Sequence, residues 1–315
     1  MPVRIAVIGA GEFGRHHARV LHEIPAARLV AVCDLDGARA EAVAAPLGTG
    51  VVTDYRQLFG SIDAATVAVP TAAHAEVATQ LLERGIDVLV EKPMAPDLAS
   101  ADGMIETARR HGRILQVGHL ERFNPAVEAA AALARLPLFF EIHRMSVFTP
   151  RSLDVDVVLD LMIHDLDIVL SLVASPVRQI HAVGLPVLTA RADIAHVRLQ
   201  FENGCVANLT ASRVSTERIR KLRFFQPRQY VSVDYTRQQV AVFSVSASSQ
   251  IEARTVAVTR AEPLARQMAA FLEAVETRAA PRAGGEEARR ALEIALRIVV
   301  EMEAHARVVA ATMAQ

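Results

Sequence analysis

The chain has 315 residues, of which 52% are hydrophobic, 22% charged and 4% aromatic, and its formal net charge is −1. This apolar fraction excludes a disordered chain, and the near-neutral charge gives no overall basic field for nucleic acid or an anionic membrane. The length suggests one large domain or two of ordinary size, with ample residues for a core.

Short β-branched runs alternate with helical patterns in the N-terminal third of the chain. Helical stretches follow the first run as far as about Ile24, and the third as far as Leu82. The expected strands are Val3–Ile8, Leu29–Cys33, Ala64–Val69, Asp87–Val90 and Ile114–Val117. Fully apolar strands alternating with helices predict an α/β fold with a parallel sheet covered on both faces.

A glycine-rich turn, Gly9-Ala10-Gly11-Glu12-Phe13-Gly14, follows the first strand and opens the first helix. Glycines allow a pyrophosphate to approach the free N–H groups of a helix N-terminus. Asp34 ends the next strand, where a carboxylate binds the adenosine ribose and repels a 2′-phosphate; the first arginine after it is Arg39. The motif predicts NAD binding in preference to NADP, and the alternative is a tight turn without a ligand.

Polar residues follow several strands, at the edge where open parallel sheets bind ligands. They are Pro70-Thr71 with His74 nearby, Glu91-Lys92-Pro93, and Gly118-His119. Lys92 is one of only two lysines among 34 basic residues, and arginine cannot replace an ammonium that must release a proton. The sequence therefore favours a catalytic Lys92 over a lysine at a solvated strand end.

A second group of polar residues lies in Val155–Val173, which we expect to be one helix. Asp160 and His164 are four residues apart and so share a face, and Asp167 is three residues further on. A histidine beside a carboxylate suits proton abstraction from an alcohol. The alternatives are a buried His–Asp pair without a catalytic role, and a metal site for which nothing else in the sequence gives support.

The pattern changes after Arg122, where polar and apolar residues alternate. Such alternation predicts an antiparallel sheet with one covered face, and Glu202-Asn203-Gly204 indicates a hairpin. The expected helices are Leu264–Arg278 and Glu286–Met313. The expected strands are Leu138–Phe148, Arg178–Val187, Ala192–Phe201, Cys205–Val214, Lys221–Phe225, Tyr230–Tyr235 and Gln239–Val245.

Basic residues gather between Arg213 and Arg228, where Lys221 also lies. One interpretation is a solvated strand face in an arginine-rich protein. The other is that one or two of these arginines bind a diphosphate, which matches the planar fork of the guanidinium.

Together, Gly9–Gly14, Glu91-Lys92-Pro93 and Asp160-x-x-x-His164-x-x-Asp167 resemble the Gfo/Idh/MocA oxidoreductases over essentially the whole chain. The resemblance implies an NAD-binding Rossmann domain over residues 1–120. It also implies an α/β domain with a large open, mostly antiparallel sheet over residues 121–315, for substrate binding and oligomerisation. The C-terminal helices are expected to pack back toward the first domain. By the same resemblance, Lys92, Asp160 and His164 are catalytic.

The resemblance also indicates which residues contact ligands. Besides the glycine loop and Asp34, it places Pro70, Thr71, His74, Glu91 and Lys92 at the cofactor. Two segments, Gly118–Pro125 and Ala207–Arg213, resemble those of members that oxidise nucleotide sugars, which implies lipid A synthesis as the setting. Arg122, Asn124, His164 and Arg213 are therefore the expected substrate contacts.

The expected reaction is oxidation of a sugar C3 hydroxyl. His164 would take the hydroxyl proton, Asp160 would orient the imidazole, and Lys92 would stabilise the developing alkoxide. His164 and Lys92 could exchange these roles. The alternative functions are a dehydrogenase of a free sugar or cyclitol, a non-catalytic NAD or sugar sensor, and an NAD-dependent glycosidase.

The remaining expectations concern location and assembly. The chain starts without a signal-peptide pattern and has no apolar stretch of about 18 residues, so we expect a cytoplasmic protein. Cys33 and Cys205 form no metal-binding or disulfide pattern. Relatives often associate through the open sheet, and a homodimer or homotetramer is therefore expected.

Overall fold

The protein is described by a computed structural model that covers residues 1–149 and 155–313. These residues form two compact units. The first comprises Met1–Phe123 and Ala261–Arg289, and the second comprises Asn124–Arg260 and Arg290–Gln315. The expected domains, with one boundary after residue 120, stay a prediction, and the first unit also contains Ala261–Arg289. Ala261–Arg289 belongs to the first unit because its helix adds Met268, Phe271 and Leu272 to that unit's core.

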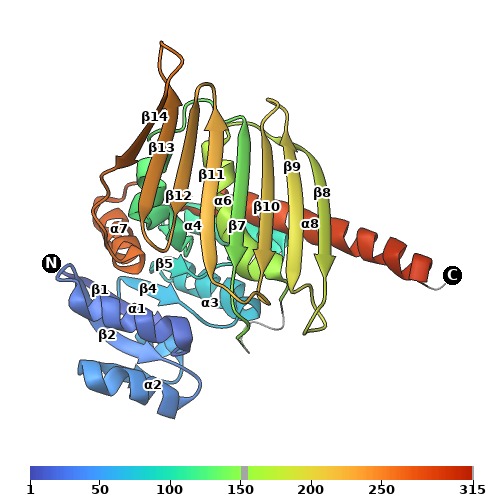
Figure 1. Cartoon of the computed structure of the whole chain (residues 1–315). Helices are drawn as coiled ribbons and strands as arrows, with labels where there is room; N and C mark the ends of the chain where they lie inside the picture. The colour runs from blue at the N-terminus through green and yellow to red at the C-terminus, as the bar shows by residue number, and fades with distance from the viewer. Residues whose placement is uncertain (150–154, 314–315) are drawn as a thin grey trace. The chain divides into compact units, whose positions relative to one another are not determined.

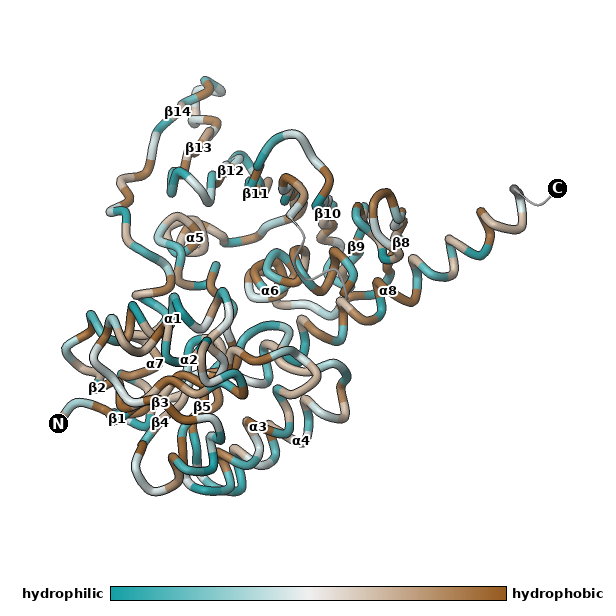
Figure 2. The backbone as a smooth tube through the Cα atoms, turned by 90° about the horizontal axis from the view of Figure 1, so that it is seen from below, coloured by the Kyte–Doolittle hydropathy of each residue, from teal (hydrophilic) through white to brown (hydrophobic). Residues whose placement is uncertain are grey.

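A six-stranded parallel sheet forms the centre of the first unit, in the order β3-β2-β1-β4-β5-β6. The strands are β1 (Val3–Ile8), β2 (Ala27–Cys33), β3 (Gly50–Val52), β4 (Ala64–Val67), β5 (Asp87–Val90) and β6 (Leu115–Val117). Figure 2 shows β1, β4 and β5 among the most hydrophobic segments of this unit. The predicted parallel sheet is confirmed. Its order reverses direction between β1 and β4, where such sheets bind ligands at the carboxyl ends of the strands.

Three helices of the first unit begin at an aspartate that caps them. Asp36 and Asp97 accept backbone N–H groups at the starts of α2 and α4, and Asp54 does so at the short helix η2. The helices are α1 (Glu12–Glu23), α2 (Gly37–Ala44), α3 (Thr71–Glu83), α4 (Leu98–Arg110) and α7 (Pro263–Thr277), with the short 3₁₀ helices η1 (Ala45–Leu47), η2 (Tyr55–Leu58) and η3 (Leu120–Phe123).

An eight-stranded sheet forms the second unit, in the order β14-β13-β12-β11-β7-β10-β9-β8 (Figure 1). Only β7 and β10 pair in parallel, and the other neighbours are antiparallel. The predicted hairpin at Glu202-Asn203-Gly204 joins β9 to β10. The strands are β7 (Phe139–Met145), β8 (Val177–Leu185), β9 (Ile194–Phe201), β10 (Val206–Ser212), β11 (Ile219–Gln226), β12 (Gln229–Asp234), β13 (Gln239–Val245) and β14 (Ile251–Val256).

Helices cover one face of this second sheet. Figure 2 shows α5 (Pro125–Ala131), α6 (Ile163–Leu172) and the later part of α8 (Gly285–Met313) on one side of the strands. Alternate strand residues such as Ile142, Leu209 and Val231 are buried against them. Within the described residues, no helix packs on the opposite face.

The expected helix over Val155–Val173 extends from Val158 to Leu172 in the structure, and its first part is wider than an α-helix. Its first part, η4 (Val158–Met162), is a π-helical turn in which the Ile163 N–H bonds to the Val158 carbonyl five residues earlier. Such wide turns accommodate an extra residue and occur often at functional sites. Asp160 lies inside this turn, about one turn before His164 on α6.

Two further properties concern the chain as a whole. Cys33 and Cys205 are both buried and free, and burial raises the pKa of Cys33 to about 12. Among the helices of residues 1–149 and 155–313, none is both long and apolar enough to cross a membrane.

Candidate active site

The glycine loop lies between β1 and α1 and is built on close backbone contacts. Gly9 has a φ of +98°, and a Cβ there would lie 2.5 Å from the Ala68 carbonyl oxygen. A Cβ on Gly14 would lie 1.7 Å from the Gly9 carbonyl oxygen. Gly11 is the N-cap of α1 and has no side chain to cover the first N–H groups. The loop therefore leaves a helix N-terminus accessible to an anion.

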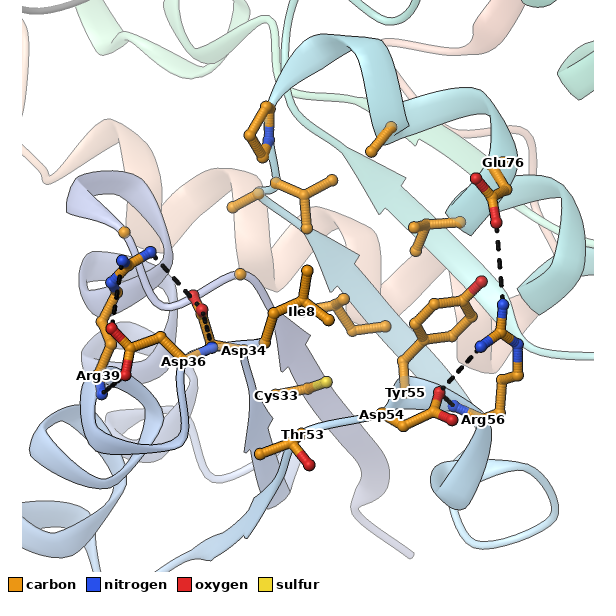
Figure 3. A pocket seen from close by; sticks show the side chains of 18 residues that line it. Ile8, Cys33, Asp34, Asp36, Arg39, Thr53, Asp54, Tyr55, Arg56 and Glu76 are labelled. Carbon is orange, nitrogen blue, oxygen red and sulfur yellow. Dashed lines mark hydrogen bonds and ion pairs between the residues drawn. The ribbon is translucent and has the colours of Figure 1, made fainter.

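A pocket of about 840 Å³ opens beside this loop, over the carboxyl ends of β1, β2 and β4 (Figure 3). Four of the residues predicted to bind the cofactor line it, namely Gly9, Gly11, Asp34 and Pro70. Its size and position at the switch point of the sheet suit the adenosine half of a dinucleotide.

One wall of the pocket consists of residues that the sequence analysis did not identify. Thr53, Asp54, Tyr55 and Arg56 follow β3 and line the pocket together with Glu76 (Figure 3). The Arg56 guanidinium lies 5.1 Å from the centre of the Tyr55 ring, and its Nη2 lies 3.8 Å from Glu76 Oε1. With three residues, β3 is too short to show a periodicity. Asp54, which caps η2, was the sequence feature that could have indicated this turn.

Asp34 is fixed by two backbone groups at the end of β2. Its Oδ2 accepts the Ala10 N–H at 2.8 Å, and its Oδ1 accepts the Asp36 N–H at 2.9 Å. The Arg39 Nη1 lies 3.6 Å from Asp34 Oδ1, and Arg39 also pairs with Asp36 (Figure 3). The carboxylate thus faces the pocket with an arginine beside it.

We expect Asp34→Ser to raise the KM for NAD by about tenfold to 100-fold, because hydrogen bonds to a charged group contribute about 1.5–3 kcal/mol. The same variant should gain NADP turnover, since Arg39 would remain to bind a 2′-phosphate without a neighbouring carboxylate at position 34. Steady-state rates with both cofactors measure this. The double variant Asp34→Ser/Arg39→Ala should lose the NADP gain, and its retention would refute the role of Arg39.

The other residues predicted at the cofactor occupy the neighbouring helix starts and strand ends. Glu12 and Phe13 are exposed on the first turn of α1, and Thr71 is the first residue of α3. His74 and Glu91 are buried, whereas Lys92 between Glu91 and Pro93 is half-buried. Their contact with a cofactor stays a prediction.

The predicted proton-transfer residues belong to the second unit, whereas Lys92 belongs to the first. Asp160 and His164 are both half-buried. The next residue, Asp165, is buried and pairs through both carboxylate oxygens with Arg144 of β7, at 2.7 and 2.8 Å. The Tyr235 hydroxyl donates to the same carboxylate at 3.2 Å. This ion pair anchors α6 to the sheet beside His164.

Asn124 and Arg213, predicted to contact substrate, hold parts of the second unit together. Asn124 caps α5 by accepting the Ala126 N–H, and its Nδ2 donates to the Tyr235 carbonyl. Arg213 is 4% exposed, and its Nη2 donates to the carbonyls of Val155 and Ala192. Direct substrate binding by either residue stays a prediction, as it does for half-buried Arg122 on η3.

The partner of Arg213 is a carboxylate that the sequence did not single out. Asp193 is 0% exposed and lies 3.2 Å from Arg213 Nε. Burial alone would raise its pKa, but the N–H groups of Thr189, Leu188 and Val187 outweigh burial and lower the pKa to about 2. Asp193 is therefore ionised, and with Arg213 it ties the loop before β9 to the segment that leads into η4.

The basic residues between Arg213 and Arg228 do not form one cluster. Arg213 follows β10 near the start of β11, whereas Arg228 lies in the turn after β11 and donates to the Val245 carbonyl. Arg223 pairs with Glu141 at 3.4 Å on the uncovered face of the sheet. As for metals, no three His, Cys, Asp or Glu residues among those described are grouped to hold an ion.

A Rossmann sheet with a glycine loop, a carboxylate at the end of β2 and a pocket over the strand ends is typical of proteins that bind NAD. Residues 3–119 match the oxidoreductase family with an NAD-binding Rossmann fold, and residues 134–250 match the Gfo/Idh/MocA C-terminal domain. The chain belongs to the Gfo/Idh/MocA oxidoreductase family, which confirms the resemblance, the fold class and NAD as the cofactor.

Several relatives of this family are similar over much of the chain. UDP-N-acetylglucosamine 3-dehydrogenase from Acidithiobacillus ferrooxidans is 34% identical over 308 residues, which cover 96% of this chain and 98% of that protein. A solved structure of that enzyme has a TM-score of 0.91 and covers 96% of this chain and 99% of its own. Inositol 2-dehydrogenase from Rubrobacter xylanophilus is 31% identical over 227 residues, covering 68% of this chain and 65% of that protein.

Proposed function

We propose that the protein oxidises the C3 hydroxyl of a nucleotide sugar, UDP-N-acetylglucosamine or a close analogue, with NAD as the hydride acceptor. The observation that carries this proposal is the 34% identity to UDP-N-acetylglucosamine 3-dehydrogenase over nearly the full length of both chains. The inositol dehydrogenase matches cover a smaller share of the chain. The 3-keto product would then be available for amination, with lipid A synthesis as the proposed setting and the cytoplasm as its place.

The catalytic roles follow from the chemistry of each side chain. NAD, when bound, would supply the acceptor for the hydride from C3. His164 takes the hydroxyl proton, and Asp160, about one helical turn earlier, orients the imidazole and supports its positive charge. The Lys92 ammonium donates to the oxygen where negative charge develops. The half-buried state of all three side chains is compatible with access by a substrate.

On the substrate side we propose Arg122, Asn124 and Arg213. Arg122 would bind the substrate directly through its guanidinium, which suits a phosphate. Asn124 and Arg213 would contribute by fixing the backbone around the substrate, because their polar atoms already bond to Tyr235, Val155 and Ala192.

NADH formation across a panel of UDP-sugars, free sugars and inositols tests the proposal. We expect turnover with UDP-N-acetylglucosamine and a product that carries a ketone at C3. UDP alone should raise the melting temperature, because a ligand that binds only the native state stabilises it. Turnover with a free inositol and no response to UDP would instead favour a cyclitol dehydrogenase. Release of a free sugar would favour a glycosidase, and NAD binding without any turnover would favour a sensor.

We also propose that the protein forms a homodimer or homotetramer through the uncovered face of the second sheet. Phe139, Phe225, Tyr230 and Phe243 form a row across β7, β11, β12 and β13, with successive ring centroids 5.6, 4.8 and 5.3 Å apart. Phe225 and Phe243 are exposed, and burying such a row favours association. Light scattering in solution measures the state, and a monomer at all concentrations would refute this assignment.

A further inference from the structure

A buried histidine of the first helix holds the residue before Lys92. His17 on α1 is 1% exposed, and its Nε2 lies 3.1 Å from Glu91 Oε1. A carboxylate only accepts, so the imidazole donates this hydrogen bond. Burial alone would raise the pKa of Glu91, but His17 and Lys92 outweigh it and keep the pKa below its usual value. Glu91 is therefore an ionised side chain fixed from the α1 side.

The space around Glu91 is equally restricted on its other side. A Cβ on Gly118, at the end of β6, would lie 2.7 Å from Glu91 Oε1 and 2.9 Å from Oε2. Glu91 Oε2 also accepts the Lys92 backbone N–H at 3.3 Å. The carboxylate thus occupies a fitted position between α1 and β6 and bonds to the backbone that carries the Lys92 side chain.

A second buried histidine holds the residue after Lys92. His74 on α3 is 1% exposed, with its Nδ1 3.0 Å from the Pro93 carbonyl and its Nε2 2.9 Å from the Val69 carbonyl. Burial lowers the pKa of His74, whereas the Pro93 and Val69 carbonyls, which only accept hydrogen bonds, favour the protonated ring. His74 therefore connects the end of the β4 run to the Pro93 backbone and does not line the pocket in Figure 3.

We propose that His17 and His74 are positioning residues that fix Glu91 and Pro93 from two sides and thereby hold the Lys92 ammonium in place for the reaction. The inference rests on the proposed function, because it gives Lys92 its catalytic purpose. The two buried histidines lie on α1 and α3 and contact Glu91 and Pro93, which follow β5. Lys92, between these two residues, is half-buried. The Lys92 side chain is thus oriented through its own backbone and through Glu91.

The first test compares His17→Leu, His17→Gln and His74→Leu with the wild type. We expect kcat to fall about tenfold to 100-fold in both leucine variants, because a displacement of about 1 Å can reduce a rate 100-fold. The KM for NAD should change less than about threefold in His17→Leu, because His17 does not line the pocket beside the glycine loop. Gln places a donor nitrogen where His17 has Nε2, so His17→Gln should recover kcat to within about threefold. Equal losses in His17→Gln and His17→Leu would overturn the proposal.

Three further variants distinguish the positioning of Lys92 by the two histidines from a general effect on the fold. His16 is exposed next to His17 on α1, so His16→Leu should behave like the wild type. Gly118→Ala should reproduce the loss in kcat without touching either histidine, because its Cβ displaces the Glu91 carboxylate. In a Lys92→Ala background, His74→Leu should change the residual rate less than about twofold. A full further loss there would overturn the proposal.

Hydrogen exchange tests whether His17 and His74 hold this backbone in place, and it needs no substrate. The backbone N–H groups of Glu91 and Lys92 should exchange about tenfold faster in His17→Leu and His74→Leu than in the wild type, because local opening becomes easier. Unchanged exchange would overturn the positioning role of the two histidines even if the enzyme is active. If the wild type oxidises no sugar of the panel, the proposed function fails. Faster exchange in both variants would still show that the two histidines hold the Lys92 backbone in place.

Discussion

Replacing His164 with alanine should lower kcat by about 1,000-fold, and Lys92→Arg should lower it by about 100-fold or more. The first change removes the proposed proton acceptor, whose contribution in general base catalysis is about 100-fold to 10,000-fold. The second keeps the positive charge but replaces a compact ammonium with a planar fork, which does not reach the same point. Steady-state NADH formation with the substrate identified by the panel measures both effects.

NAD affinity separates these catalytic losses from damage to the fold. His164 lies in the second unit and the adenosine pocket in the first, so we expect His164→Ala to bind NAD within about threefold of the wild type by calorimetric titration. Lys92→Arg should also bind NAD nearly as the wild type does. A suitable control is Lys221→Arg, on β11 at the uncovered face, which should keep full turnover. Wild-type rates in either test variant would refute the assignment.

Replacing Gly14 with alanine should destabilise the protein by about 3 kcal/mol and weaken NAD binding at least about tenfold. The new Cβ would lie 1.7 Å from the Gly9 carbonyl oxygen and 2.8 Å from its carbon, so α1 must move away from the loop. Overpacking of this kind typically costs about 1–3 kcal/mol, and backbone atoms cannot turn aside as a side chain can. The displaced helix N-terminus would no longer face the pyrophosphate.

Urea unfolding measures the change in stability, and titration with NAD measures the change in affinity. Gly103→Ala is a matched control, because a Cβ at this α4 position meets nothing within 4 Å. It should leave NAD binding unchanged and stabilise the protein by about 0.5–1 kcal/mol, since alanine favours a helix more than glycine does. If both variants were equally stable, the close contact at Gly14 would not govern this loop.

Much of the fold could be predicted because buried parallel strands carry a strong local signal. Val3–Ile8 and Asp87–Val90 match β1 and β5 at both ends, and Gln239–Val245 matches β13. The prediction failed for elements that are too short or too exposed to show such a signal. β3 has three residues, and β14 (Ile251–Val256) is exposed along most of its length at the edge of its sheet.

Local sequence patterns were enough to single out the glycine loop, Asp34, Lys92 and the pair Asp160 and His164 as candidate site residues. Each of these is recognised from local patterns: a turn after an apolar strand, an acid at a strand end, or two polar residues one helical turn apart. The family resemblance then added chemical roles to those positions.

The contacts between side chains far apart in the sequence became visible in the folded structure alone. His17 contacts Glu91 74 residues later, Arg213 contacts Asp193, and Thr53–Arg56 line the pocket beside the glycine loop. The structure also placed Asp160 in a π-helical turn. Local patterns cannot specify such contacts, because they depend on how strands are ordered in a sheet and how helices pack on it. The same patterns therefore found Lys92 and His74, but they indicated neither His17 nor the contacts that both histidines make beside Lys92.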